Sequence, residues 1–408
     1  MLKNPWWTVL GAVMGLIVCN GPIIQFAYAV FLKPLTEEFK TDRATMSVAI
    51  LLAFIATAIG TPIVGRLVDR YGIRRVTFPL MVVFAGSIAL LGVLPYSAPT
   101  FIALFALAGL LAAGNTPLPY AKAVAAAFDK QRGLALGISM AGVGLGTAIV
   151  PKLAQAMIDS FGWRGAYIGL AVLIVVLALP ALAFLIRDPL APVKGGTVAA
   201  HAPAAPLMAG LTGAEALGTW RFWAMFVAFF TLCLACAGTF AHIVAMLTDR
   251  GVPAATATSS LAAAGIALII GRVIAGYLLD KLFAPYVALF FIALTLVGVG
   301  LLLDVKSPMQ ASIAAVLVGI GLGAEVDLIG YMISRSFGMR SFGEIYGYQF
   351  GGFLLASGFG PFLMGLSYAR TGSYDTAIIA FAIGLIAACV LMLTVGPYAY
   401  AAKQAEAA

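Results

Sequence analysis

Residues 65–72 read GRLVDRYG and residues 276–283 read GYLLDKLF, so both contain the pattern G-x-x-x-D-[RK] after a long apolar run. A second pair of segments is also related. GISMAGVGLGTAIVP (137–151) and GYQFGGFLLASGFGP (347–361) share glycines at their first and sixth places and a final proline. The two members of each pair occupy corresponding places in the two halves of the chain. The sequence therefore predicts an internal duplication.

The composition predicts a protein that lipid surrounds. The chain has 408 residues, of which 62% are hydrophobic and 10% charged, whereas soluble proteins have about 25% charged residues. A membrane-spanning helix needs about 20 apolar residues, and little chain is left over for a soluble domain. Twelve spans are expected, at 7–31, 44–64, 76–97, 100–124, 133–156, 166–187, 221–247, 254–279, 285–303, 308–334, 343–368 and 374–399.

The distribution of charge predicts the orientation. If the N-terminus is cytoplasmic, the cytoplasmic loops and termini carry 14 Lys and Arg and the opposite loops carry seven. This positive-inside bias places both termini in the cytoplasm, and it explains the net charge of +8 without a nucleic-acid partner. The first span is too long for the core of a signal peptide, so we expect it to be retained. Short loops without an N-x-[ST] site favour a prokaryotic inner membrane.

A Pro-, Ala- and Gly-rich stretch at 188–213 divides the chain at its centre. We expect an N-terminal bundle at 1–187, a cytoplasmic linker at 188–220 and a C-terminal bundle at 221–408. The predicted fold class is all-α integral membrane, with twelve transmembrane helices in two pseudo-symmetric six-helix bundles. Duplication of this kind is typical of secondary transporters, whose substrate site lies near the bilayer midplane between the repeats.

The segment GRLVDRYGIRR (65–75) resembles the loop motif that follows the second span in the major facilitator superfamily. The resemblance extends over the whole chain in span number, orientation and duplication. It implies that Gly65, Asp69 and Arg70 gate the cytoplasmic side. The alternative is that these residues only anchor the loop at the lipid headgroups.

Arg272 lies inside the eighth predicted span, where a charge costs about 2.5–3.5 kcal/mol and needs a partner or a task. In the repeat, Thr61 takes its place, so the scaffold does not require a cation there. Asp327 in span 10 is expected at the same depth, eight residues from Arg335 as Arg272 is eight from Asp280. Two hypotheses follow. Arg272 and Asp327 form a structural ion pair, or Arg272 binds an anionic substrate while Asp327 or Glu325 takes up a proton.

Other polar residues in the spans are candidates for the same site. Two prolines weaken span 4 beside Asn115 and Tyr120, and the sequence NGP at 20–22 weakens span 1. His242 is equally compatible with a relay and with a packed hydrogen bond. Tyr331, Tyr346, Tyr348 and Gln349 are weaker candidates, because tyrosines near span ends usually belong to the interfacial belt. The candidate substrate-binding residues, besides Arg272, are Asn115, Tyr120, Gln25, Tyr28, Tyr331 and His242.

The C-terminal half is similar to the monocarboxylate porters and the oxalate–formate exchangers. The resemblance rests on Arg272, on His242 followed by TDRG, and on GAEVDLIGY (323–331) running to YGYQFGG (346–352). It implies that Arg272 binds a substrate carboxylate. This chain departs from both groups at three places. Phe353 replaces the second cation of the oxalate exchanger, Phe26 replaces the proton-carrying lysine of the animal porters, and Leu268 replaces their aspartate.

One cation suits one carboxylate, so the sequence predicts symport of a lactate- or pyruvate-like monocarboxylate with a proton. The alternatives are proton-independent carboxylate exchange and a transport-inactive receptor. No nucleophile–base pair, metal-ligand cluster or phosphate-binding loop is present in the sequence, so we expect neither an enzyme nor a cofactor. We expect the transporter to be a monomer, with the lipid bilayer, the monocarboxylate and the proton as its partners.

Overall fold

The computed structural model describes residues 4–41, 43–94, 97–186 and 209–400. The described residues form helices joined by short turns, with one isolated bridge between Gly210 and Gly338. Eleven helical segments are long and apolar enough to cross a membrane. One of them, residues 132–185, is 54 residues long and is broken at Gly162, where φ is 70°. At about 1.5 Å per residue, this segment is long enough to cross a hydrocarbon core of about 30 Å twice. The twelve predicted crossings are thereby accounted for.

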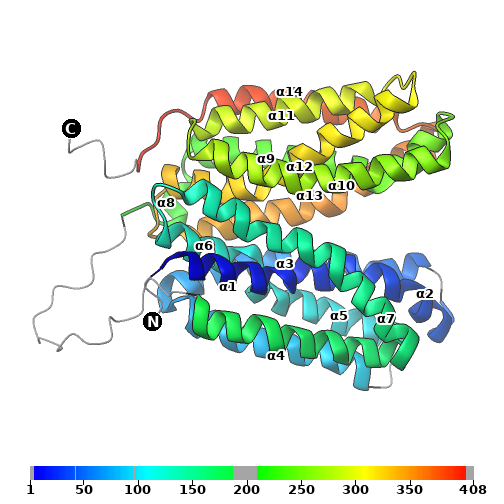
Figure 1. Ribbon diagram of the computed structural model, residues 1–408, viewed down its shortest axis with the longest axis horizontal. Coiled ribbons are helices and arrows are strands. Elements are labelled where there is room, and N and C mark those ends of the chain that lie inside the picture. The colour runs from blue at the N-terminus through cyan, green and yellow to red at the C-terminus, as the bar shows by residue number, and fades with distance from the viewer. Residues whose placement is uncertain (1–3, 42, 95–96, 187–208, 401–408) are drawn as a thin grey trace, which may run out of the picture.

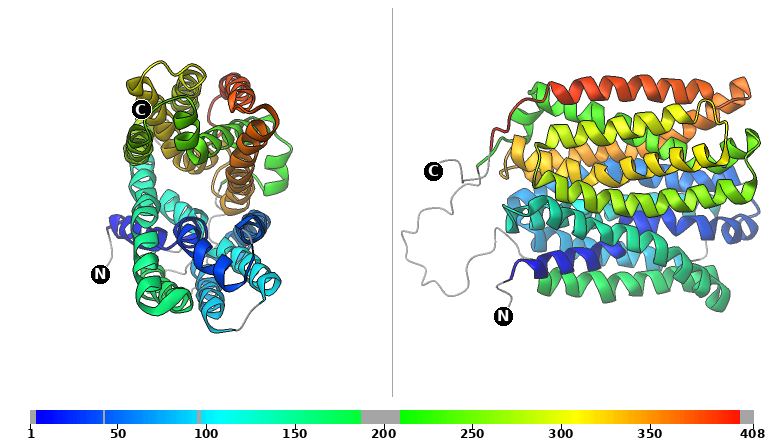
Figure 2. Two further views of the ribbon diagram at one scale, coloured as in Figure 1. Left: turned by 90° about the vertical axis from the view of Figure 1, so that its right-hand side faces the viewer. Right: turned by 45° about the horizontal axis from the view of Figure 1, so that its top comes forward.

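The N-terminal bundle contains α1 to α7, and the C-terminal bundle contains α9 to α14. Figure 1 shows the two bundles stacked one above the other, and Figure 2 shows them from the side and from the end. The helices of the first bundle are α1 (Trp6–Ile17), η1 (Gly21–Phe26), α2 (Tyr28–Glu38), α3 (Arg43–Tyr71), α4 (Ile73–Val93), α5 (Ala98–Ala112), η2 (Ala113–Asn115), α6 (Pro117–Ala127), α7 (Arg132–Pro180) and η3 (Ala181–Leu185).

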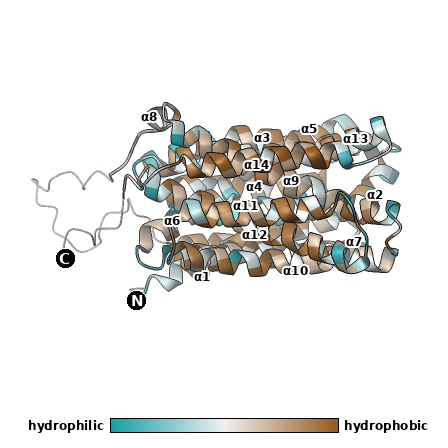
Figure 3. Cartoon of the chain, turned by 90° about the horizontal axis from the view of Figure 1, so that it is seen from above, coloured by the Kyte–Doolittle hydropathy of each residue, from teal (hydrophilic) through white to brown (hydrophobic). Residues whose placement is uncertain are grey.

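The short helix α8 (Gly213–Leu217) precedes the second bundle, whose helices are α9 (Trp220–Asp249), α10 (Ala254–Leu279), α11 (Ala284–Leu301), α12 (Pro308–Ser336), α13 (Phe342–Thr371) and α14 (Asp375–Leu393). The start of α1 and the end of α14 lie at the same end of the molecule (Figure 1), which we call the terminal face. Apolar residues cover the length of the helices and polar residues gather at their ends (Figure 3). Most of the predicted linker, residues 188–208, lies outside the described residues.

Prolines interrupt spans 1 and 4, as the sequence predicts. Pro22 has no N–H to donate to the carbonyl of Val18, four residues earlier, and the chain continues as the π-helix η1. The side-chain amide of Asn115 donates to that free carbonyl across 2.8 Å. In span 4, Pro117 likewise cannot bond the carbonyl of Ala113, and the hydroxyl of Thr116 donates to it across 3.1 Å. The two breaks therefore lie side by side, and the break in span 4 supplies a hydrogen bond to the carbonyl that the break in span 1 leaves free.

Two pairs of helices join the bundles. Helix α3 packs against α13, and α10 packs against α7. These four helices correspond to each other in the duplication, because α3 and α10 end in the G-x-x-x-D segments while α7 and α13 begin just before the glycine-rich segments. The contact between the bundles is therefore made twice, by equivalent elements.

Candidate functional site

Arg272 lies where the two bundles meet and is 6% exposed. Helices α10 and α12 come together closely at this level, because a Cβ on Gly323 would clash with the carbonyl of Leu268. The Arg272 Nε donates to the carbonyl of Gly323 across 3.2 Å, within the C-terminal bundle. Its Nη1 donates to the carbonyl of Met140 on α7, in the N-terminal bundle, across 2.5 Å. The guanidinium therefore bridges the two bundles through backbone carbonyls.

Arg272 forms no ion pair with any residue that the structure describes. Asp327 is close enough to interact with it electrostatically, but neither carboxylate oxygen of Asp327 has a hydrogen-bond partner among the described residues. Asp327 is fully buried, at 0% exposure. A buried polar group without a partner costs about 1–3 kcal/mol, and a charged one costs more. The structure thus contains a cation and an acid that are neighbours but are not bonded to each other.

Glu325 lies two residues from Asp327 on α12 and has a different environment. It is buried, and both of its carboxylate oxygens also lack hydrogen-bond partners among the described residues. Its electrostatic neighbours are Cys233 and Cys236 on α9, inside the C-terminal bundle. Only Asp327, of the two candidate proton acceptors, neighbours Arg272.

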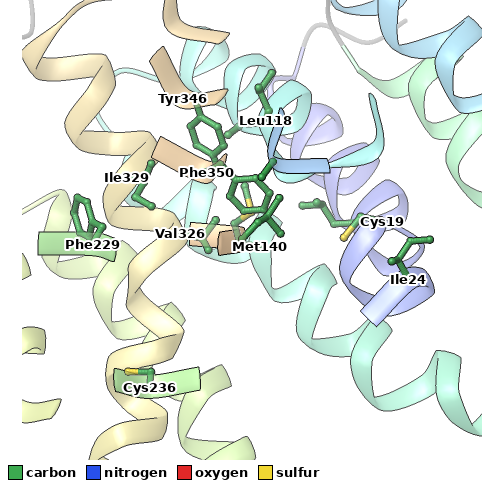
Figure 4. Close-up of a cluster of buried hydrophobic side chains, with 14 of the residues drawn as sticks. Cys19, Ile24, Leu118, Met140, Phe229, Cys236, Val326, Ile329, Tyr346 and Phe350 are labelled. Atoms are coloured by element: carbon green, nitrogen blue, oxygen red, sulfur yellow. The ribbon is translucent and has the colours of Figure 1, made fainter. Parts of the chain in front are cut away.

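Tyr346 on α13 lies near Met140, Val326 and Phe350 (Figure 4), and Met140 is the residue whose carbonyl accepts from Arg272. It is 0% exposed, so it does not belong to an interfacial aromatic belt. Arg272 and Asp327 both act electrostatically on its hydroxyl. From the sequence, Tyr346 is only a weaker candidate, because its position near a helix end is typical of belt residues. Its burial depends on the packing of the two bundles.

The polar candidates of spans 1 and 4 are bonded within the N-terminal bundle, with one exception. Tyr28 donates to the carbonyl of Met46 across 2.6 Å, and the Tyr120 hydroxyl lies 3.4 Å from the side-chain oxygen of Asn115. Gln25 is half-buried and forms no hydrogen bond with the described residues.

His242 and Tyr331 lie at different levels of the C-terminal bundle. The His242 Nε2 is 3.1 Å from the carbonyl oxygen of Pro361, and its ring is 5.4 Å from that of Tyr374, which lies beyond the outer end of α13. The guanidinium of Arg335 lies 5.5 Å from the centre of the Tyr331 ring. These contacts hold both side chains in place, on opposite sides of the level of Arg272.

The gating candidate Asp69 caps a helix of the other bundle. Its Oδ1 accepts from the N–H of Gly343 across 2.9 Å, and its Oδ2 accepts from the N–H of Glu344 across 2.8 Å. Both amides belong to the first turn of α13, where free N–H groups and the helix dipole favour a negative charge. The carboxylate of Asp69 thereby ties α3 to α13 at the terminal face.

Asp280 repeats this contact in the other half. It accepts from the N–H groups of Gly133 and Leu134, in the first turn of α7, across 2.7 and 2.8 Å. Burial raises the pKa of Asp280, and the two donated hydrogen bonds oppose that rise. The glycine four residues before each aspartate has an equally specific function. A Cβ on Gly65 would meet the carbonyl of Gly343, and one on Gly276 would lie 2.7 Å from the oxygen of Gly133. The pattern G-x-x-x-D therefore encodes a close approach followed by a cap, once in each half.

Further ion pairs close the terminal face, and the sequence did not reveal their partners. Lys122 on α6 is 2% exposed and binds Asp69 across 2.6 Å. Arg66 binds Glu344 of the other bundle across 2.6 Å. Arg70, by contrast, lies over the ring of Tyr71, 5.2 Å from its centre.

The second half of the terminal face has its own cross-bundle contacts. Arg335 on α12 binds Asp129 across 3.0 Å, and Arg132 on α7 donates to the hydroxyl of Ser334 across 3.0 Å. Hydrogen bonds between the bundles are thus concentrated from the terminal face to the level of Arg272. The structure is closed on this side.

Comparison with known proteins agrees with this architecture. The chain is 28% identical over 327 residues to monocarboxylate transporter 13 of Rattus norvegicus, covering 78% of this chain and 71% of the relative. It is 28% identical over 241 residues to the oxalate:formate antiporter of Oxalobacter formigenes. This match covers 57% of this chain and 53% of the antiporter. The crystal structure of the human organic anion transporter MFSD10 (TETRAN) has the same fold, with a TM-score of 0.74 and 13% sequence identity. The match covers 96% of this chain and 100% of the MFSD10 chain.

The family model of the Major Facilitator Superfamily matches residues 14–361, which include both G-x-x-x-D segments, Arg272 and Asp327. The match to this family model and the arrangement in two six-helix bundles identify the same family. The chain is a multi-pass membrane protein of the Major Facilitator Superfamily.

Proposed function

We propose that this protein is a secondary active transporter that carries a small monocarboxylate, such as lactate or pyruvate, together with a proton. The observation that carries the proposal is the state of Arg272. It is a buried cation between the bundles, and no carboxylate of the described chain neutralises it. Two relatives at 28% identity are named for the transport of monocarboxylates and of oxalate and formate.

The geometry of the guanidinium suits a carboxylate. Its Nε and Nη1 are held by the carbonyls of Gly323 and Met140, while no described residue accepts a hydrogen bond from Nη2. A guanidinium recognises a carboxylate through paired N–H donors. Because the Met140 carbonyl belongs to the other bundle, a substrate that replaces it would loosen one contact between the bundles. Substrate binding and bundle movement would thereby be coupled.

Asp327 is the proposed proton acceptor. A charged Asp327 beside Arg272 would compete with the substrate for the guanidinium, whereas a protonated one would leave it free. Glu325 shares its burial but not its proximity to Arg272, so we assign the proton to Asp327. A dianion would leave one charge without a cation, because Phe353 packs on Phe350, with ring centres 5.2 Å apart, where the resemblance implies a second cation.

We propose that the contacts of Asp69, Asp280, Gly65 and Gly276 form the gate. Opening would break both helix caps and the ion pair of Arg66 with Glu344. Arg70 would act only at the headgroups. We further propose that the terminal face is cytoplasmic, that the protein works as a monomer in an inner membrane, and that the structure is its state closed toward the cytoplasm.

Proton-independent exchange of carboxylates is the second candidate, because one relative is an oxalate:formate antiporter. Transport by purified protein in liposomes separates the two. Proton-coupled symport predicts lactate accumulation that follows an inward proton gradient and that collapses when a protonophore is added. Lactate exchange that ignores the pH gradient would contradict coupling and favour the exchanger. Absence of any lactate or oxalate transport would contradict both.

A further inference from the structure

The hydroxyl of Tyr346 is held in a fixed position. The ring stacks between those of Phe342 and Phe350 on the same helix, with centres 5.7 and 5.9 Å away and planes inclined by 28° and 23°. Gly330 on α12 also packs against the ring, because a Cβ added at Gly330 would lie 3.5 Å from Cε2 of Tyr346. The hydroxyl therefore has little freedom to find a partner elsewhere.

This hydroxyl is buried and has no hydrogen-bond partner among the described residues. Buried tyrosine hydroxyls normally have one, and an exception in a native structure calls for an explanation. Tyr28 and Tyr120, by contrast, are bonded within the N-terminal bundle. Tyr167 also has a buried hydroxyl without a partner among the described residues, but its electrostatic neighbour is Tyr28, whereas Tyr346 neighbours Arg272 and Asp327. The unused hydrogen-bonding capacity of Tyr346 therefore points to a role in binding a ligand.

Three helices of the C-terminal bundle bring unsatisfied groups to the same place. Arg272 on α10 has its Nη2 free, Asp327 on α12 has both oxygens free, and Tyr346 on α13 has its hydroxyl free. Each pair of these residues interacts electrostatically. A carboxylate alone would occupy the arginine but would leave the tyrosine unpaired. A ligand with a second oxygen next to its carboxylate would satisfy both.

We propose that Tyr346 is a specificity-determining residue that binds the oxygen on carbon 2 of a 2-hydroxy- or 2-oxo-monocarboxylate. This inference rests on the proposed function, in which Arg272 holds the carboxylate. The hydroxyl of Tyr346 donates to the carbon-2 oxygen, and the alkyl end of the acid contacts apolar neighbours. Met140, Val326 and Phe350 supply such surfaces around Tyr346 (Figure 4). Plain short-chain acids without the second oxygen leave the tyrosine unpaired and bind more weakly.

Lactate and propionate separate the two parts of the site, since they differ only by the hydroxyl on carbon 2. Binding of each acid to the purified full-length protein is measured by isothermal titration calorimetry. We expect the wild type to prefer lactate by about tenfold or more, because a site with hydrogen-bonding groups rejects an analogue that lacks the matching oxygen. Tyr346→Phe should bring the ratio of the two dissociation constants close to one, mainly through weaker lactate binding.

Tyr368→Phe is the matched control, because it removes a hydroxyl from the exposed outer end of the same helix. It should leave the ratio unchanged. Equal affinity of the wild type for lactate and propionate would overturn this inference, but it would leave the proposed role of Arg272 in binding the carboxylate standing. So would a Tyr346→Phe protein that elutes as a monodisperse peak and keeps the wild-type ratio. Failure of the wild type to bind either acid would overturn the proposed function and this inference together. If the variant does not fold, equal wild-type affinities for the two acids still overturn the inference.

Discussion

At the scale of single residues, the sequence predicted that the charge in α10 needs a partner or a task, and the structure gives its partners as two backbone carbonyls. The prediction was possible because bilayer depth follows from the position along a helix. The ion pair of Lys122 and the burial of Tyr346 could not be predicted in this way. Both depend on which helices lie together, and a single sequence contains no direct record of that. The same limit applies to Arg66, whose partner Glu344 lies in the other bundle.

The two buried acids of α12 provide a test of proton coupling. Asp327→Asn should abolish the accumulation of lactate against its gradient while exchange of external for internal lactate continues, because the variant keeps the volume of the side chain but cannot carry a proton. Glu325→Gln is the matched control, two residues away on the same helix, and should still accumulate lactate. Tracer uptake with and without a pH gradient measures both. The reverse result would move the proton site to Glu325.

At the scale of helices, the duplicated G-x-x-x-D segments are the feature that the sequence predicted best. The repeat identified both aspartates and both glycines as equivalent, and the structure gives each pair the same contact with the opposite bundle. The prolines of spans 1 and 4 also mark breaks as expected. The sequence did not show that Asp69 forms an ion pair with a buried lysine, whereas Asp280 forms no ion pair with the described residues. That asymmetry follows from Lys122 on α6.

This asymmetry predicts unequal effects of equivalent substitutions. Asp280→Ala should remove one helix cap, a loss of about 1 kcal/mol, and raise the population open at the terminal face about fivefold. Asp69→Ala should cost about 3–5 kcal/mol, because it also leaves Lys122 buried without a partner. Adding Lys122→Met should restore much of that loss. Thermal unfolding measures the costs, and a distance between spin labels at Arg75 and Lys281 measures the opening.

Equal costs of Asp69→Ala and Asp280→Ala, or no rescue by Lys122→Met, would contradict this account of the terminal face. Both labelled positions are exposed and belong to different bundles.

The duplicated glycines predict a steric effect on the same contacts. A Cβ at Gly276 would lie 2.7 Å from the carbonyl oxygen of Gly133, and the neighbour is backbone that cannot turn aside. Gly276→Ala should therefore separate the bundles at the terminal face and lengthen the same spin-label distance. Gly300→Ala is the control, because a Cβ there has no neighbour within 4 Å. An unchanged distance in Gly276→Ala would show that the contact is not needed for closure.

At the scale of the whole molecule, composition and repeat were enough to predict twelve crossings in two bundles. The difference lies at Gly162, where two predicted spans run together with only one residue outside helical geometry. The predicted loop at 157–165 contains Gly162, but hydropathy cannot show that the turn is so short, because a turn of this size needs few polar residues. The closure of the terminal face could not be predicted either, since a sequence does not record which of several arrangements of the two bundles the chain adopts.

The positive-inside bias predicts the orientation of the whole molecule. Fluorescent reporters that fold only in the cytoplasm should be active when fused after residue 408 or inserted into the loop between α8 and α9. They should be dark in the loop between α9 and α10, which carries Arg250. Alkaline phosphatase fusions at the same places should give the complementary pattern. The opposite pattern would invert the assignment of the terminal face to the cytoplasm.

The central claim is that Arg272 is reserved for the carboxylate of a substrate, and lactate binding to the purified protein tests it most directly. Titration calorimetry should show saturable binding by the wild type and a loss of at least about thirtyfold in Arg272→Gln, because removing one partner of a buried charged pair costs 2–5 kcal/mol. Arg370→Ala, at an exposed place on α13, should bind like the wild type. Undiminished lactate binding by a folded Arg272→Gln protein would contradict the claim.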